Sequence, residues 1–195
     1  MDSLILDLLN ESKSNDTKEK EYKVRKTITV NNKMQKNYKY DLVMPEGDLS
    51  DLQSEFPEFK PYYTPKQMLE MGVFEGKYFR DCHNEYPSNW FSKAKEAKDE
   101  ADPSLNYFGV KSRKPLSEWR KNGWIIGNDP RGWAEWYFRM YYGRRDPEVD
   151  KKQIKRWLSF KRHQAQVKLN CKVGDKNCRH VQRQALLQWS YKCDI

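Results

Sequence analysis

Residues 129–145 read DPRGWAEWYFRMYYGRR, and residues 146–169 read DPEVDKKQIKRWLSFKRHQAQVKL. Each stretch opens with Asp-Pro, a helix-start signal in which the Asp side chain caps exposed amides and the Pro occupies the first turn. Gly143 is expected to stop the first helix, and the second is expected to run to about Leu169. These two helices, with the helical signals around them, predict a mainly α fold.

Shorter helices are predicted on both sides of this stretch from their end signals. Thr64 has a capping-box layout with Gln67, three residues later, and Gly72 would end that helix. Ser88 is expected to cap another helix. The expected shorter helices cover residues 49–56, 64–72, 89–100, 116–121 and 179–191.

The first 60 residues carry a different signal. Residues 10–21 contain no apolar residue, so they are expected to be a flexible linker. Apolar and polar residues then alternate on both sides of Asn31-Asn32, which predicts a β-hairpin between Val24 and Met44. The chain is thus expected to divide into a flexible segment (1–21), a hairpin and loop region (22–61) and a compact, basic helical domain (62–195).

The composition is that of a folded protein without a membrane span. Only 37% of the residues are hydrophobic, but 7 Trp, 12 Tyr and 8 Phe can furnish a core. No apolar run approaches the roughly 18 to 20 residues of a membrane helix. The run Leu4–Leu9 is too short for a secretory signal. We therefore expect a soluble, intracellular protein of the cytoplasm, the nucleus or a virion.

The positive charge is concentrated at one end of the chain. The formal net charge is +9, but residues 111–195 contain 21 Lys and Arg against 8 Asp and Glu, together with six of the seven Trp. Clustered cations release condensed counterions from a phosphate backbone, so this region predicts a surface that binds nucleic acid. The alternative is a solvated helix face rich in Lys and Arg.

The expected contacts with nucleic acid are cations of the last three helices. Arginine suits phosphate oxygens because its planar fork donates two parallel hydrogen bonds. The spacing matches no standard DNA- or RNA-binding motif, so the sequence does not separate DNA from RNA. The predicted contact residues are Arg131, Arg139, Arg144, Arg145, Lys151, Lys155, Arg156, Arg162, Arg179 and Arg183.

The aromatic residues of 129–145 lie three and four residues apart, which places Trp133, Trp136 and Tyr137 on neighbouring positions of a helix. They are predicted either to line an aromatic pocket or to form a core helix. The pocket would favour an enzyme that modifies a base or nucleotide, with Asp129 as its carboxylate. The alternative roles are a helix cap for Asp129 and an ion-pair partner of Arg131 or Arg139 for Glu135.

The cysteines indicate no standard metal module. Cys171, Cys178, His180 and Cys193 are ligand types that zinc accepts, but the first two are separated by six residues, where structural zinc sites have two to four. A disulfide between Cys171 and Cys178 is the alternative in an oxidising compartment. Phosphate-loop, Gly-x-Ser-x-Gly and His-Glu-x-x-His motifs do not occur. No metal site and no cofactor are predicted, and whether the protein is an enzyme stays open.

Taken together, DPRGW (129–133), GRR (143–145), QIKRW (153–157) and RQALLQW (183–189), with TPKQMLEMGVFEGKYF (64–79) upstream, resemble a family found in fungi, large DNA viruses and phages. The resemblance covers about residues 62–192. Similar small helical domains have been proposed to join DNA-base hypermodification pathways, so the resemblance implies a role in DNA modification or genome handling. It assigns no catalytic residue.

Three functions are therefore considered. The first is nucleic-acid binding by a basic, aromatic-rich helical surface. The second is an enzyme with an aromatic pocket that modifies a base or nucleotide. The third is a non-catalytic interaction or virion protein whose apolar N-terminal residues, Leu4, Ile5, Leu8 and Leu9, dock on a protein partner.

Overall fold

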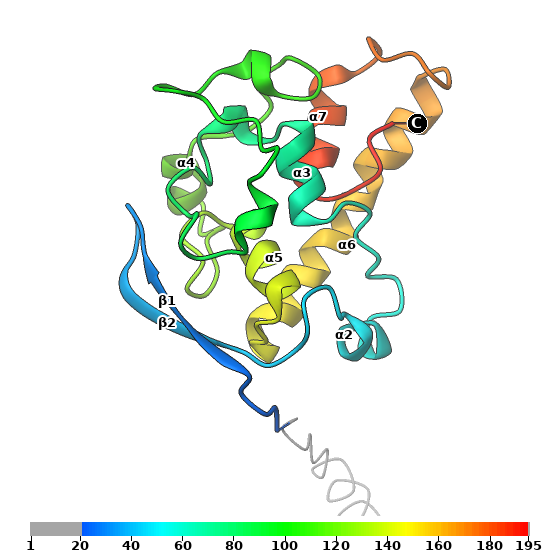
Figure 1. Cartoon of the computed structure of the whole chain (residues 1–195). Coiled ribbons are helices and arrows are strands. Elements are labelled where there is room, and N and C mark those ends of the chain that lie inside the picture. The colour runs from blue at the N-terminus through cyan, green and yellow to red at the C-terminus, as the bar shows by residue number, and fades with distance from the viewer. Residues whose placement is uncertain (1–20, 195) are drawn as a thin grey trace, which may run out of the picture.

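A computed structural model describes residues 21–194 of the chain (Figure 1). The predicted fold class is confirmed: the protein is mainly helical, with one two-stranded antiparallel hairpin near the N-terminus. The predicted flexible segment and the apolar N-terminal cluster lie outside the described residues, apart from Glu21. Within 21–194, no helix has the length and apolar character needed to cross a membrane.

The hairpin pairs β1 with β2 from Lys26 opposite Leu42 to Val30 opposite Tyr38. Most helices follow the predicted segments, and three short 3-10 turns connect them. The elements are β1 (Lys26–Asn31), β2 (Lys36–Leu42), α2 (Ser50–Glu55), α3 (Pro65–Met71), η2 (Phe74–Gly76), η3 (Ser88–Trp90), η4 (Pro103–Leu105), α4 (Leu116–Lys121), α5 (Trp133–Tyr142), α6 (Pro147–Asn170) and α7 (His180–Gln188).

Several helix ends form as their signals predict. Thr64 and Gln67 make a reciprocal capping box at the start of α3. The Asp146 side chain accepts a hydrogen bond from the Val149 amide at the start of α6. Gly143 ends α5 with a φ of 123°, and a Cβ there would lie 2.1 Å from the Met44 carbonyl oxygen. Only glycine therefore fits this junction between α5 and the chain that follows β2.

The helix predicted over residues 89–100 is wrong. Only Ser88–Trp90 forms a 3-10 turn there, and the rest of the segment is irregular. Its backbone amides bond instead to a distant part of the chain: Lys95 N–H donates to the Leu69 carbonyl, and Ala97 N–H donates to the Gly76 carbonyl. These tertiary hydrogen bonds replace the helical ones, so a good capping residue was not sufficient to start a helix.

The start of α5 also differs from the prediction. The helix begins at Trp133, with Gly132 as its N-cap residue, rather than at Asp129. Asp129 is fully buried and binds arginine side chains, so its carboxylate is not available as a helix cap.

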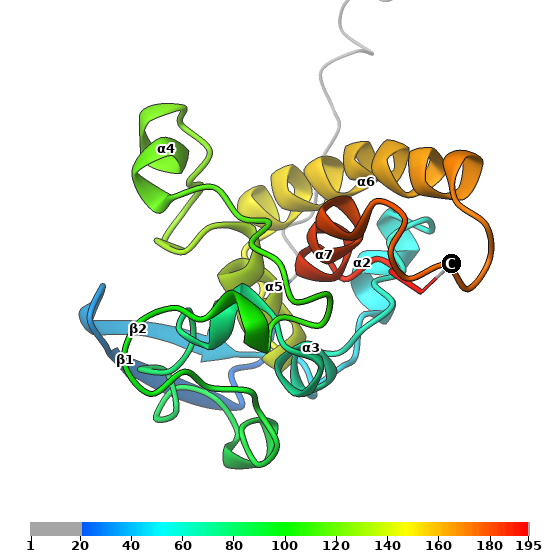
Figure 2. The same cartoon turned by 90° about the horizontal axis from the view of Figure 1, so that it is seen from above.

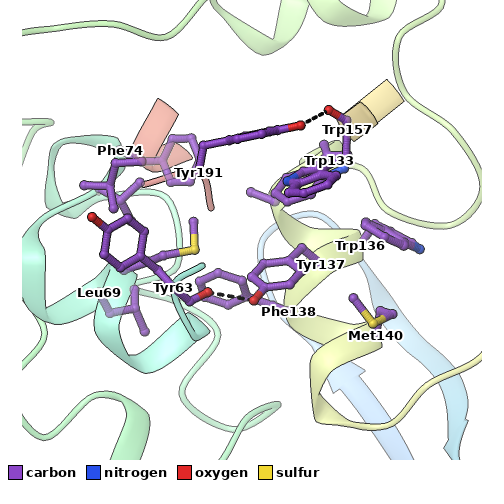
Figure 3. Close-up of a cluster of buried hydrophobic side chains, with 14 of the residues drawn as sticks. Tyr63, Leu69, Phe74, Trp133, Trp136, Tyr137, Phe138, Met140, Trp157 and Tyr191 are labelled. Carbon is purple, nitrogen blue, oxygen red and sulfur yellow. Dashed lines mark hydrogen bonds between the residues drawn. The ribbon is translucent and has the colours of Figure 1, made fainter. Parts of the chain in front are cut away.

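Helix α5 forms the centre of the core. Every residue from Trp133 to Met140 is buried, so this helix has no solvent-facing side. Aromatic side chains from α5 and from both ends of the helical region meet around it (Figure 3). The Tyr137 hydroxyl donates to the Tyr63 carbonyl at 2.7 Å, and the Tyr191 hydroxyl donates to the Trp157 carbonyl. Helix α7 packs against α6 (Figure 2), and its Leu186 and Leu187 belong to the same core.

Candidate nucleic-acid interface and aromatic pocket

The arginines of residues 131–145 lie inside the protein. Arg139 is 0% exposed and makes ion pairs with three carboxylates. Its Nε is 2.6 Å from Glu85 Oε1, its Nη1 is 3.0 Å from Asp129 Oδ1, and its Nη2 is 3.4 Å from Glu135 Oε1. Burial by itself would lower the pKa of Arg139, but the groups around it, including Glu135 and Glu85, raise that pKa above its ordinary value. The Arg139 side chain is therefore positively charged and is held in place by its ion pairs.

Arg144 shares the Asp129 carboxylate with Arg139. Its two terminal nitrogens bind the two oxygens of Asp129 at 2.7 and 2.6 Å, the bidentate geometry that suits a planar guanidinium. Arg145 is paired in the same way with Asp51, at 2.9 and 3.0 Å. Both cations thus have carboxylates as fixed partners.

Arg131 completes this set. It binds Asp81 at 2.9 Å and Glu135 at 3.0 Å, and its side chain is only 4% exposed. The predicted ion-pair role of Glu135 is thereby confirmed, since it binds both Arg131 and Arg139. Burial raises the pKa of Glu135 in spite of these two cations. We call Arg131, Arg139, Arg144 and Arg145, with their carboxylate partners, the buried arginine network.

The hairpin covers this network. Gln35 accepts a hydrogen bond from Arg139 Nη2 at 2.7 Å and donates to the Asn128 carbonyl at 2.8 Å. The rings of Tyr38 and Tyr40 lie 5.3 and 5.4 Å from the Arg139 guanidinium carbon. Stacking over an aromatic face is favourable for arginine, so strand β2 contributes to the site that holds Arg139.

Five of the predicted contact residues are therefore not on the surface. Four belong to the buried arginine network. The fifth, Arg183, is 1% exposed and donates to the backbone carbonyls of Cys193 and Asp175. A side chain that is buried and held by partners within the protein does not contact a phosphate without unfolding its surroundings. The five side chains are Arg131, Arg139, Arg144, Arg145 and Arg183.

The cations of α6 lie in a different environment. Among the described residues, none of its seven Lys and Arg side chains forms an ion pair with a carboxylate. Lys151, Lys155 and Arg162 are exposed, and their spacings of four and seven residues place them on one side of the helix. We call these three side chains the α6 basic face. Arg179, before α7, is also exposed.

A pocket of about 500 Å³ opens beside α6. It lies within the size range of small-molecule binding sites. Residues from η2, α4, α5, α6 and α7, and from the loops next to them, line it. Its aromatic side chains are Phe74, Tyr78, Trp119, Trp124, Trp133, Phe160 and Trp189, and its cations are Arg113, Lys114, Arg131, Arg156 and Arg162.

This is not the pocket that the sequence predicted. Trp133 lines it, but Trp136 and Tyr137 are core residues with at most 1% exposure. The Trp136 indole donates to Asp150 Oδ1 at 2.7 Å inside the protein. Asp129, the predicted carboxylate, is sealed within the buried arginine network.

Six aromatic side chains that line the pocket were missed. Each of them comes from a short turn or loop or from a helix whose sequence looks polar, so none was identified as part of an aromatic site. The sequence did contain one signal: Trp119 lies between Glu118 and Arg120, and a Trp among charged residues of a short helix has little reason to be buried. The missed residues are Phe74, Tyr78, Trp119, Trp124, Phe160 and Trp189.

Arg156 is the one cation of the pocket lining whose guanidinium lies over aromatic rings. Its guanidinium carbon lies 5.5 Å from the Trp119 ring and 5.7 Å from the Trp189 ring. Its hydrogen bonds to the described residues use only Nη1, which donates to the Trp124 carbonyl at 2.8 Å and to Gln153 Oε1 at 3.1 Å. Burial lowers its pKa, and no carboxylate of the described residues pairs with it. The edge formed by Nε and Nη2 is therefore an unused pair of donors.

Gln188, which lines the pocket, carries a buried donor that is unpaired in the described part of the chain. The residue is 6% exposed, and its buried Nε2 has no hydrogen-bond partner among residues 21–194. Leaving a buried amide donor unpaired is costly, so such an atom is normally explained by a partner that binds there.

The pocket has binding chemistry rather than evident catalytic chemistry. Its lining residues, as far as the structure describes the chain, include no Asp and no Glu. Its only histidine is His163, whose pKa is lowered by burial and by the neighbouring Arg162. Two of its cations, Arg156 and Arg162, have no carboxylate partner among the described residues, and together with flat aromatic walls they suit a ligand that is both anionic and planar.

The cysteines do not form the zinc set considered from the sequence. Cys171 and Cys178 are joined by a disulfide, and Cys193 is buried with its sulfur 3.2 Å from the Tyr63 hydroxyl. Within residues 21–194, no group of three or more potential metal ligands comes together.

Comparisons of this chain with protein-family models, with curated proteins and with solved structures find no match. The resemblance to a family of fungi, large DNA viruses and phages stays a prediction. The geometry of the α6 basic face and of the pocket is therefore the basis on which a function is proposed.

Proposed function

We propose that the protein binds nucleic acid through the α6 basic face. The observation that carries this proposal is the absence of carboxylate partners for the α6 cations within the described part of the chain, although carboxylates hold all four cations of the buried arginine network. Unpaired, exposed cations in a row are free to replace the counterions of a phosphate backbone.

The pocket supports a nucleic acid over another polyanion. Arg162 belongs both to the α6 basic face and to the pocket lining, so the phosphate-binding side chains and the aromatic rings form one continuous surface. Aromatic rings next to cations are the usual platform for unpaired bases. DNA modification or genome handling is the biological role that the resemblance suggests for such a surface.

The two other functions have less support. An enzyme that modifies bases would need an acid or base beside its substrate, and within residues 21–194 the pocket lining offers one histidine, His163, and no carboxylate. The interaction or virion role depended on Leu4, Ile5, Leu8 and Leu9, which lie outside the described residues.

The test is a titration of the full chain with labelled single-stranded DNA, double-stranded DNA and RNA at two salt concentrations. We expect binding that weakens steeply with salt, because each phosphate contact contributes about 0.9 to the slope of log K against log salt. Absence of binding to all three at low salt would overturn the proposal.

A charge-reversal variant locates the surface. Lys151→Glu, Lys155→Glu and Arg162→Glu together should weaken binding at least tenfold and reduce the salt slope by roughly 3. The matched control reverses three exposed lysines elsewhere, Lys39, Lys60 and Lys93. Equal effects of the two variants would mean that net charge alone, and not α6, determines binding.

A further inference from the structure

We infer that the aromatic pocket binds one nucleoside monophosphate unit, with the phosphate on Arg156 and the base against the tryptophan rings. This inference deepens the proposed function, on which it rests for the source of the ligand. The unit is either an unpaired nucleotide of a bound strand or a free nucleotide, and the experiment below separates these sources.

The phosphate site follows from the hydrogen bonds of Arg156. The guanidinium has five N–H donors, and its hydrogen bonds within residues 21–194 all leave from Nη1. The Nε and Nη2 edge can bind two oxygens of a phosphate at once. Because Gln153 and the Trp124 carbonyl already fix Nη1, this edge is held in place before a ligand arrives. Arg162, without a carboxylate partner among the described residues, supplies a second positive charge at the same pocket.

The base site follows from the stacked rings beside Arg156. Trp189 stacks on Phe160 at 4.7 Å and on Trp133 at 4.9 Å between ring centroids. Trp119 lies nearly parallel to Trp189, with 6.4 Å between their centroids, and Trp124 is 37% exposed at the pocket. Flat, partly exposed rings favour a planar ligand, and every base has a π face that stacks on them.

The edge of the base would be read by Gln188. Its Nε2 is a donor, so it selects an acceptor, such as a ring nitrogen or a carbonyl oxygen of a base. A simple inorganic anion would leave this donor unpaired and the rings uncovered. The three features together therefore favour a nucleotide over a phosphate or sulfate ion.

The experiment compares complete nucleotides with ligands that lack either the phosphate or the nucleoside. Tryptophan fluorescence and calorimetry are used to titrate the full chain with AMP, GMP, CMP and UMP, with the corresponding nucleosides, and with inorganic phosphate. We expect at least one monophosphate to bind roughly tenfold or more tightly than its nucleoside and than phosphate. Equal affinity for a nucleotide and for phosphate, or for a nucleotide and its nucleoside, would overturn the inference.

Variants assign the parts of the ligand to residues. Arg156→Gln should weaken monophosphate binding roughly tenfold or more, whereas the matched control Arg120→Gln, on an exposed arginine of α4 that does not line the pocket, should not change it. Trp124→Ala should weaken binding about fivefold or more through lost stacking. Gln188→Leu should leave the folded state intact, because it removes an unpaired buried donor, and should reduce the discrimination between bases.

Binding of nucleic-acid strands distinguishes a strand from a free nucleotide as the source of the ligand. It also tests the proposed function separately from the pocket inference. A duplex with one unpaired nucleotide is compared with the same duplex fully paired, for the native chain and for Arg156→Gln. A preference for the unpaired nucleotide that Arg156→Gln abolishes supports the strand as the source. Binding of monophosphates without binding of any strand would overturn the proposed function and leave the pocket inference standing, with a free nucleotide as ligand. Salt-dependent strand binding without binding of monophosphates, unaffected by Arg156→Gln, would overturn the pocket inference and leave the proposed function standing.

Discussion

Arg139, in α5, and Arg156, in α6, are both largely removed from solvent, but their partners differ. Arg139 is surrounded by carboxylates that raise its pKa despite its burial. Arg156 packs against tryptophan rings, has no carboxylate partner among the described residues, and its pKa is lowered by burial. A paired buried cation holds the protein together, whereas an unpaired one keeps the capacity to bind an anion that arrives from outside.

Loss of a paired arginine should have the largest effect. Arg139→Leu removes a fully buried cation and leaves Glu85, Asp129 and Glu135 with less compensation. We expect the free energy of unfolding to fall by about 4 kcal/mol, because uncompensated buried charges are expensive. Urea denaturation measures this change, and Arg120→Leu on the exposed surface, with an expected change within about 0.5 kcal/mol, is the control. A small effect at Arg139 would contradict the expected difference in stability contribution between Arg139 and Arg156.

Loss of a shared carboxylate should have the next largest effect. Asp129→Asn keeps the shape of the side chain and one oxygen but removes the negative charge that binds Arg139 and Arg144. We expect a loss of about 3 kcal/mol in the free energy of unfolding. Affinity for nucleic acid, measured at a temperature where the variant is folded, should be unchanged. Lost affinity in a fully folded variant would instead support a functional role for this carboxylate.

The unpaired arginine should contribute little to stability. Arg156→Leu replaces a cation that has no carboxylate partner within residues 21–194 by an apolar side chain that can pack against Trp119 and Trp189. We expect the free energy of unfolding to change by less than about 1 kcal/mol, in contrast to Arg139→Leu. The same denaturation experiment tests this, and a loss as large as that at Arg139 would show that Arg156 is structural.

Asp150 extends the comparison to a buried carboxylate that has no ion-pair partner in the described part of the chain. It accepts hydrogen bonds from the Trp136 indole and the Asp146 amide, and burial raises its pKa to about 6. The folded state therefore binds this proton more tightly than the unfolded chain does. The stabilisation from this group is fully present below about pH 4 and is lost as the pH rises through about 6.

Nuclear magnetic resonance follows this group directly. The Trp136 indole proton should shift with a midpoint near pH 6, because its acceptor titrates there. The indole proton of Trp133, which donates to the Gln153 backbone carbonyl, is the internal control and should not follow that titration. A midpoint near 4 for Trp136 would mean that the Asp150 carboxylate is stabilised as a charge after all.

The helices were predictable where a local signal decides them. Thr64 with Gln67, and Asp146 with Pro147, specify helix starts through contacts within one turn of chain. Ser88 offered the same kind of signal and failed, because the amides that follow it bond to carbonyls of residues 69–76. Local sequence contains no information on such distant partners.

The candidate site was predictable only in part for the same reason. A count of charges identifies α6 as basic, but it does not distinguish Arg139 from Lys155. Arg139 is buried because Glu85, 54 positions away in the chain, and the hairpin are brought to it by the fold. Similarly, Trp119 and Trp189 become walls of one pocket only after α4 and α7 have packed.

The contact between the hairpin and Arg139 has a consequence for how the chain opens. An isolated two-stranded ribbon is at best marginally stable, so local unfolding of β1 and β2 would normally be frequent. Here such an opening would remove Gln35, Tyr38 and Tyr40 from Arg139 and admit water to its ion pairs. Hydrogen exchange at the hairpin amides should therefore be as slow as exchange in α5. A fragment that began at residue 62 would lose one wall of its own charged interior.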